Sequence, residues 1–334
     1  MLTLALVLPA VAEQRNRARA DACVANLKQI GQAVHNYHAA FKQLPPGSGG
    51  TEGGEAPESG NHGRIGPLVA ITPFVQQQSL WEVIINPYTD PISNLQFPSM
   101  GPVPWYDAEV YKPWSRGPAV YRCPDRPGEQ PDDQPKIVYT LNSASPDGLM
   151  TNYVACFGDG TFNVGSTTDI TSDESVRHGR ATKRGMFRSG EVTKFRDCLD
   201  GLANTVMFSE TRSEIDGRPG LEGIAKGIVG LSLNPSLCLA AAEDPETKWW
   251  PFGRGSRWCD GALAITGFQT VLPPNSPSCT SDNGLEDAIA SASSYHPGGV
   301  HLLFGDGHVA FASDTIDTGD PKQPGVSNQP GYAV

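Results

Sequence analysis

The chain has 334 residues, a formal net charge of −11 and a sequence pI of about 5.1. Proteins that bind nucleic acids need clustered Lys and Arg to displace counterions from phosphates. The only basic cluster here is Arg15, Arg17 and Arg19, so we expect no nucleic-acid partner. With 37 glycines and 29 prolines, the composition favours a loop-rich, mostly β body over a solvated, disordered chain.

The first predicted element is a helix over residues 1–44 with two unlike parts. Residues 1–12 carry no charge, but they are fewer than the roughly 20 apolar residues that span a bilayer. They also lack the basic region that precedes the apolar core of a secretory leader. Over residues 20–44, apolar side chains recur in alternating steps of three and four, the spacing of a single helical stripe. Pro45 and Pro46 then end the helix.

The two parts of this helix need two kinds of partner. We expect the stripe to pack on the chain's own body through Leu27, Ile30, Val34, Tyr37, Phe41 and Leu44. The part that is apolar all round must enter a membrane or bundle with other chains. The side chains predicted to do so are Leu2, Leu4, Leu6, Val7, Leu8, Pro9 and Val11. The periodicity equally fits a clipped signal anchor followed by an ordinary surface helix.

The rest of the chain, residues 45–334, is predicted to be a β-rich head. Residues 47–63 form a flexible acidic loop by composition, and a short helix is expected over 80–85. Brief apolar runs at 138–141, 153–157 and 206–208 favour antiparallel strands. Residues 301–304 and 309–312 form a hairpin with Asp306-Gly307 in its turn. Residues 212–300 form either a subdomain or an elaborated sheet edge.

Several blocks, in order, carry a resemblance to a known family. The start, LVLPAVAEQRNRARADACVANLKQIGQAVHNYHAAFKQLPPG, is followed by similar blocks at 66–77, 121–125, 151–154 and 185–205. Near the end, in SSYHPGGVHLLFGDGHVAFASDTID, His296 is followed by nine residues and then Asp306-Gly307. The chain thus resembles the DUF1559 family, whose members carry a type IV prepilin N-terminus and a C-terminal signature with this spacing.

The resemblance implies both a fold and a function. The expected fold is α+β and pilin-like, a long N-terminal helix packed on an antiparallel β-sheet head with large loop-rich insertions. The expected function is a structural subunit of a pilus-like or pseudopilin-like filament that polymerises with itself through residues 1–12. A basic leader, a processing site and further apolar residues are expected to precede this segment. A prepilin peptidase and the pilus or type II secretion assembly machinery are the implied partners.

The implied location is the cell envelope, with the chain anchored in the inner membrane before it assembles into a cell-surface or extracellular filament. A binding module is the alternative: the same chain tethered singly in the membrane, with a head that grips a glycan or a secreted substrate. Trp105, Trp249 and Trp250 would then be candidate contacts, although each is more often a core residue.

No motif for catalysis is apparent, and we expect no enzyme activity. The chain has no H-E-x-x-H, no G-x-S-x-G and no phosphate-binding loop. His301 and His308 fall on opposite arms of the hairpin and could approach each other, but structural roles are favoured. His296 is expected to hydrogen-bond in the loop before the hairpin, with Asp306 as its partner.

The cysteines and one loop complete the expectations. Seven widely spaced cysteines suit an oxidising compartment, and spacing alone leaves their connectivity open. From the positions where the family commonly carries cysteine, the resemblance implies the pairs Cys23–Cys123, Cys238–Cys279 and Cys198–Cys259, with Cys156 free. No cofactor is expected. The resemblance admits calcium as the one exception, because pseudopilin heads hold it in a loop; the candidate ligands here are Asp282, Asn283, Glu286 and Asp287.

Overall fold

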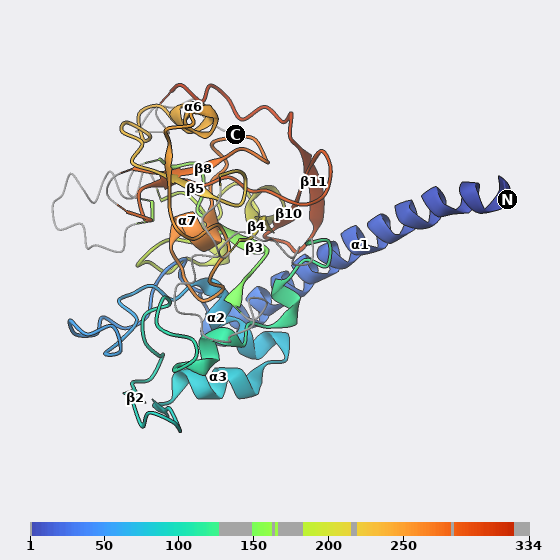
Figure 1. Ribbon diagram of the computed structural model, residues 1–334. Coiled ribbons are helices and arrows are strands. Elements are labelled where there is room, and N and C mark those ends of the chain that lie inside the picture. The colour runs from blue at the N-terminus through green and yellow to red at the C-terminus, as the bar shows by residue number, and fades with distance from the viewer. Residues whose placement is uncertain are drawn as a thin grey trace.

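One long helix opens the chain and projects from a globular head (Figure 1). The computed structural model describes residues 2–126, 149–161, 164–165, 183–214, 219–281 and 284–323, so the strand expected over 138–141 lies outside the described residues. Helix α1 comprises Leu2–Phe41, 40 residues or about 60 Å, and continues through Pro9. It ends where Lys42 takes a positive φ of 58° and donates its N–H to the carbonyl of His38.

The C-terminal half of α1 forms part of the core of the head. Leu27, Ile30 and Val34 are fully buried. They fall on one helical stripe, so the predicted packing face is present. Gly31 lies on the same face, and a Cβ there would stand 3.1 Å from Leu303. The missing side chain therefore lets the helix approach the sheet closely.

Phe41, by contrast, was wrongly expected to be a packing residue. Its side chain is 54% exposed. The ring contacts Tyr37 at a centroid distance of 4.6 Å and Phe74 at 6.5 Å, but its outer face points to solvent. The reason is its position in the last turn, where the chain reverses at Lys42. Tyr37 is half-buried, and Leu44 beyond the turn is fully buried.

The main sheet has five strands in the order β11-β10-β4-β3-β7. Their bounds are β3 Tyr153–Cys156, β4 Val206–Glu210, β7 Gly267–Phe268, β10 Gly299–Phe304 and β11 Val309–Ser313. α1 packs on β10 and β4. Strands β10 and β11 form the predicted hairpin, in which Leu303 pairs with Val309 and Gly307 has a φ of 94°.

A second sheet, in the order β6-β5-β8-β9, lies at the far side of the head with the helix α6 (Figure 1). Its elements are β5 Ile224–Lys226, α6 Leu237–Glu243, β6 Lys248–Trp249, β8 Ser278–Thr280 and β9 Ala288–Ile289. They surround a small core of their own that includes Leu231 and Ile289. All fall within residues 212–300, whereas β7 and the short helix α7 (Leu263–Thr266), from the same stretch, join the main sheet and core.

Both sheets are mixed, although antiparallel sheets were expected. β3 pairs with β7 in parallel, and β5 pairs with β8 in parallel. A parallel pair needs a long crossover between its strands, and short apolar runs do not reveal which distant segments such a crossover joins. The architecture is α+β, with an N-terminal helix and several sheets.

Short helices and turns cover the side of the head where α1 enters. They are α2 Pro67–Ala70, η1 Thr72–Val75, α3 Gln78–Ile85, η2 Lys112–Ser115 and η3 Ala119–Tyr121, with a small pair of strands, β1 Tyr88–Thr89 and β2 Gln96–Phe97. Two further turns, η4 Phe195–Asp197 and η5 Leu202–Asn204, precede β4. α3 contains the predicted helix over 80–85. In the core beneath, Trp258 donates its indole N–H to the carbonyl of Trp114 at 2.9 Å.

Two fully buried charges stabilise the loop around α7. Asp260 lies 2.8 Å from Arg64 and 3.0 Å from Arg257. Burial would raise the pKa of Asp260, but the two guanidinium groups outweigh burial and hold it below its ordinary value. Arg254 has a pKa that burial lowers to about 9. Its guanidinium donates, at 2.7–3.2 Å, to the backbone carbonyls of Leu263, Ala264, Gly267 and Ser291.

Candidate functional site

The projecting part of α1 is the most conspicuous feature outside the head (Figure 1). Arg15, Arg17 and Arg19 are exposed on it. The side chains of the predicted polymerisation residues, Leu2, Leu4, Leu6, Val7, Leu8, Pro9 and Val11, lie outside the described part of the chain, although their backbone is helical. Among the helices that are described, none has both the length and the apolar character that a bilayer span requires.

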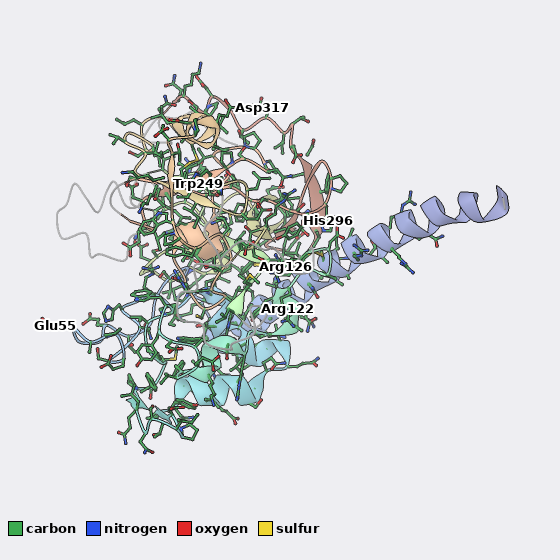
Figure 2. All side chains as sticks on the ribbon, viewed as in Figure 1. Glu55, Arg122, Arg126, Trp249, His296 and Asp317 are labelled. Atoms are coloured by element: carbon green, nitrogen blue, oxygen red, sulfur yellow. A yellow bond between two sulfur atoms is a disulfide. The ribbon has the colours of Figure 1, made fainter. Side chains whose placement is uncertain are left out.

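At the base of the projection, two turns of α1 are bound to the head. Cys23 forms a disulfide with Cys123. One turn earlier Arg19 pairs with Asp125 at 3.1 Å, and one turn later the side-chain amide of Asn26 donates to the carbonyl of Arg122 at 2.9 Å. Figure 2 shows Arg122 beside this part of the helix. We call these three contacts the helix clamp.

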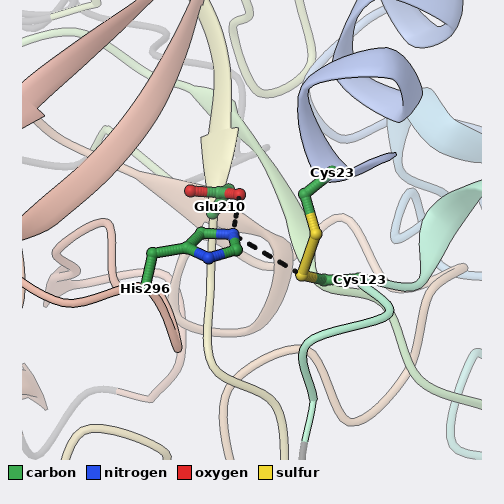
Figure 3. A group of neighbouring side chains, drawn as sticks. All are labelled: Cys23, Cys123, Glu210 and His296. Atoms are coloured by element: carbon green, nitrogen blue, oxygen red, sulfur yellow. Dashed lines mark hydrogen bonds and ion pairs between the residues drawn. A yellow bond between two sulfur atoms is a disulfide. The ribbon is translucent and has the colours of Figure 1, made fainter. Parts of the chain in front are cut away.

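A largely buried cluster of two carboxylates and two imidazoles adjoins the clamp and shares Asp125 with it. His296 places Nδ1 3.1 Å from Asp125 Oδ2 and Nε2 3.1 Å from Glu210 Oε1. The other oxygen of Glu210 accepts the backbone N–H of His301 at 2.8 Å and lies 3.1 Å from its Nδ1. Figure 3 shows His296 and Glu210 facing the disulfide, with Nε2 3.8 Å from Cys123 Sγ. The cluster thus joins β4, the loop before β10 and the clamp.

The charges of this cluster stabilise one another. Burial disfavours the imidazolium of His296, but Glu210 and Asp125 outweigh burial and raise its pKa above the ordinary value. Burial likewise disfavours the carboxylate of Glu210, but hydrogen bonds from His296 and His301 hold its pKa below the ordinary value. Both shifts favour the charged forms, an imidazolium between two carboxylates.

The residues of the C-terminal signature do not meet. His296 was expected to bond to Asp306, and this is wrong. Asp306 lies in the hairpin turn, where it accepts the backbone N–H of His308 at 3.0 Å and lies 2.7 Å from its Nδ1. Gly307 supplies the positive φ of that turn. His308 also stacks on Phe304, whereas His301 turns inward to Glu210.

The cysteines agree with two of the three expected pairs. The disulfides are Cys23–Cys123 and Cys238–Cys279, and Cys156 is free. The third pair is wrong, because Cys198 and Cys259 are both free. Cys198 follows the turn η4, where Phe195 packs on His35 and His38 of α1.

Cys259 is buried elsewhere, before α7 and next to the Pro104 carbonyl. Burial is the leading cause that raises the pKa of all three free thiols, to about 12 for Cys156. These thiols are therefore protonated at neutral pH and weak as nucleophiles.

The remaining candidates are scattered. Asp282 and Asn283 lie outside the described residues, so calcium stays a prediction. Asp287 accepts a hydrogen bond from Ser281 at 2.6 Å, and Glu286 lies 4.0 Å from Arg64.

The three tryptophans proposed as contacts differ in exposure. Trp105 is 47% exposed, with the Arg64 guanidinium over its ring. Trp249 packs on the second core and Trp250 stacks on Phe252, so both serve packing.

Sequence reasoning missed Glu210 and Asp125, which are the actual partners of His296. One signal was available for Glu210. The apolar run Val206-Met207-Phe208 continues through Ser209 into a carboxylate, and a charge at the end of a buried strand needs a partner. Asp125, in contrast, follows Cys123 in a loop, where no periodic pattern distinguishes it from a solvated charge.

Comparison with known proteins places the chain in a family. The sequence model of a family described as "Protein of unknown function (DUF1559)" matches residues 13–319. No curated protein and no solved structure matches the chain. Because the match covers most of the 334 residues, the chain belongs to the DUF1559 family.

Proposed function

We propose that this chain is a structural subunit of a pilin-like or pseudopilin-like filament that assembles through the N-terminal part of α1. The observation that carries the proposal is the division of one continuous helix. Its second half is buried in the head, whereas its first half extends away from it (Figure 1). The extended half begins with an uncharged apolar segment, residues 1–12. Packing these segments from many copies side by side would remove them from water.

The helix clamp supports the same proposal mechanically. A subunit held by its helix must pass force from the helix to the head without losing the fold. Cys23, at the base of the projection, is covalently bound to the head, and Leu27 and Ile30 are buried in the following turns. Arg15, Arg17 and Arg19 would lie between the apolar segment and the heads, where they can pair with acidic groups of neighbouring copies. Such pairs would weaken as salt increases.

The same proposal includes location and partners. Export to the cell envelope fits two disulfides, because such bonds form in oxidising compartments. Membrane insertion through the apolar segment would precede assembly. A prepilin peptidase and a pilus or secretion assembly machine would process and stack the subunits. Identical head-to-tail contacts that do not close into a ring would then give a helical filament.

Electron microscopy of the purified full chain tests the proposal. We expect uniform fibres with α1 at the centre. Leu6→Glu should abolish the fibres, because a buried carboxylate without a partner is strongly unfavourable in an apolar bundle. Gln32→Glu is the matched control, since it adds the same charge at an exposed position of the same helix and should still assemble. Near-ultraviolet circular dichroism should show a folded head in all three proteins.

Two outcomes would contradict the filament. Monodisperse wild-type particles under all assembly conditions would be one, and fibres of Leu6→Glu indistinguishable from wild type would be the other. Monodisperse particles that retain polysaccharide would favour the membrane-tethered binding module instead.

A further inference from the structure

Four buried side chains at the helix clamp have the chemistry of a metal site. They are Cys23, Cys123, Glu210 and His296, and one ligand atom from each lies within 4.8 Å of the other three (Figure 3). All four are buried, with exposed fractions of 5% or less. Two sulfurs, one imidazole nitrogen and one carboxylate oxygen are donors that Zn²⁺ accepts in tetrahedral sites. At present the two sulfurs are joined in a disulfide, which has no thiolate to offer.

The spacing of these donors suits zinc once the sulfurs separate. With Zn–S near 2.3 Å and Zn–N and Zn–O near 2.0–2.2 Å, neighbouring donors of a tetrahedral site lie about 3.3–3.8 Å apart. His296 Nε2 is already 3.8 Å from Cys123 Sγ and 3.1 Å from Glu210 Oε1. Only the Cys23 and Cys123 sulfurs must move substantially.

The groups behind these donors are also arranged as a metal site requires. A zinc-bound imidazole usually donates its other N–H to a carboxylate, and a ligating carboxylate is usually hydrogen-bonded through its second oxygen. His296 Nδ1 faces Asp125, whose other oxygen pairs with Arg19. Glu210 Oε2 is held by the backbone N–H of His301. A disulfide alone does not require such outer partners around a neighbouring histidine and glutamate.

We propose that, when the Cys23–Cys123 disulfide is reduced, this site binds one Zn²⁺ through Cys23, Cys123, His296 and Glu210. The disulfide and the metal are then alternative cross-links between α1 and the head. In a reducing environment zinc would hold the clamp, and oxidation would replace zinc with the covalent bond. The proposal is independent of filament assembly, because it concerns only residues within one chain.

The exchange balances in electrons and protons. A dithiol or phosphine reductant supplies two electrons, the S–S bond breaks, and two protons from water or the reductant give two thiols. The reductant leaves as a disulfide or a phosphine oxide. Zn²⁺ then displaces both thiol protons, and any proton on His296 Nε2, to solvent. His296 Nδ1 stays protonated and donates its hydrogen bond to Asp125. In the reverse direction, a small-molecule disulfide accepts two electrons from the thiolates and leaves as two thiols after taking up two protons from solvent, and Zn²⁺ leaves as the S–S bond between Cys23 and Cys123 forms.

Metal content and cobalt spectroscopy of the full chain test the site. The other disulfide, Cys238–Cys279, is first removed with Cys238→Ala/Cys279→Ala, so that reduction cannot create a second pair of thiols. This background protein is purified from a reducing cytoplasm without oxygen. We expect one Zn²⁺ per chain. Replacing zinc with Co²⁺ should give thiolate-to-cobalt charge transfer and the intense visible bands of tetrahedral coordination. Oxidation to the disulfide should release the metal stoichiometrically.

Two variants in this background test whether the clamp residues hold the zinc. Cys23→Ala/Cys123→Ala should bind no zinc, and retention of zinc would assign it to the three other cysteines and overturn the proposal. Asp125→Asn, which keeps the size of the side chain, should weaken zinc binding about 10- to 100-fold without removing the cobalt bands. Its circular dichroism should match that of the background protein. A reduced background protein that is folded yet takes up no zinc would equally overturn the proposal.

Discussion

Removing the clamp disulfide should cost more stability than removing the other disulfide, because it closes the longer loop. The Cys23–Cys123 bond spans 100 residues, and the Cys238–Cys279 bond spans 41. The chain-entropy expression gives about 4.7 kcal/mol for the first loop and about 3.9 kcal/mol for the second. We therefore expect Cys23→Ala/Cys123→Ala to lower the free energy of unfolding by up to about 4.7 kcal/mol. Cys238→Ala/Cys279→Ala should cost slightly less.

Urea titration in the presence of a metal chelator measures both losses, with tryptophan fluorescence as the signal. Hydrogen exchange then locates the effect. Without the clamp disulfide, amides of α1 from Arg17 to Asn26 should exchange faster, because this part of the helix loses its covalent link to the head and keeps non-covalent contacts such as the Arg19–Asp125 ion pair and the hydrogen bond from Tyr153 to the Cys23 carbonyl. The second double variant should leave these amides unchanged. Two results would refute the reasoning: a loss of unfolding free energy below about 1 kcal/mol for the clamp variant, or unchanged amide exchange between Arg17 and Asn26.

Four further substitutions test charged side chains, three of them buried. Because the folded pKa of Glu210 is below 4.5 and that of His296 is above 6.5, the stability from this pair should be complete between those pH values. It should fall as pH drops through the folded pKa of Glu210 or rises through that of His296, and Glu210→Gln should flatten this profile of melting temperature against pH. Asp260→Asn should cost about 3–5 kcal/mol in urea unfolding, since the guanidinium groups of Arg64 and Arg257 lose the buried carboxylate that they share. Arg254→Met should cost several kcal/mol by the same measurement, because buried carbonyls lose charged donors worth about 1.5–3 kcal/mol each. Arg19→Ala should cost less than about 1 kcal/mol, because its side chain is 46% exposed; a larger loss would show that the ion pair is essential to the clamp.

Local patterns predicted local structure well. The alternating apolar steps placed Leu27, Ile30 and Val34 on the buried face of α1, and Asp306-Gly307 marked the turn of the β10–β11 hairpin. Both signals depend only on residues a few positions apart, where helical and turn geometry is fixed by the backbone. Phe41 has the right spacing but lies in the last helical turn. Periodicity says which side a residue faces, not whether the neighbouring layer extends that far.

Contacts between distant segments were beyond the same patterns. His296 is bonded to Glu210, 86 residues away, and to Asp125 in a loop. The partner depends on which strands lie side by side, and the parallel β3–β7 pair shows that chain order does not give this. Arg254 is harder still, because its acceptors among the described residues are backbone carbonyls, which have no signature in the sequence. The Cys23–Cys123 disulfide could be anticipated, but the proposed metal site could not, because His296 and Glu210 come from distant segments of the chain.

The contact between α1 and the C-terminal hairpin has a consequence for synthesis. His35 lies 2.8 Å from the carbonyl of Gly305, which is 270 residues later in the chain. At about 5–20 residues per second, a ribosome needs roughly 14–54 s to make the intervening sequence. The first helix therefore leaves the ribosome long before the strand that covers it exists. During that interval its apolar stripe and its uncharged start are both open to whatever targeting factor or holdase meets the nascent chain.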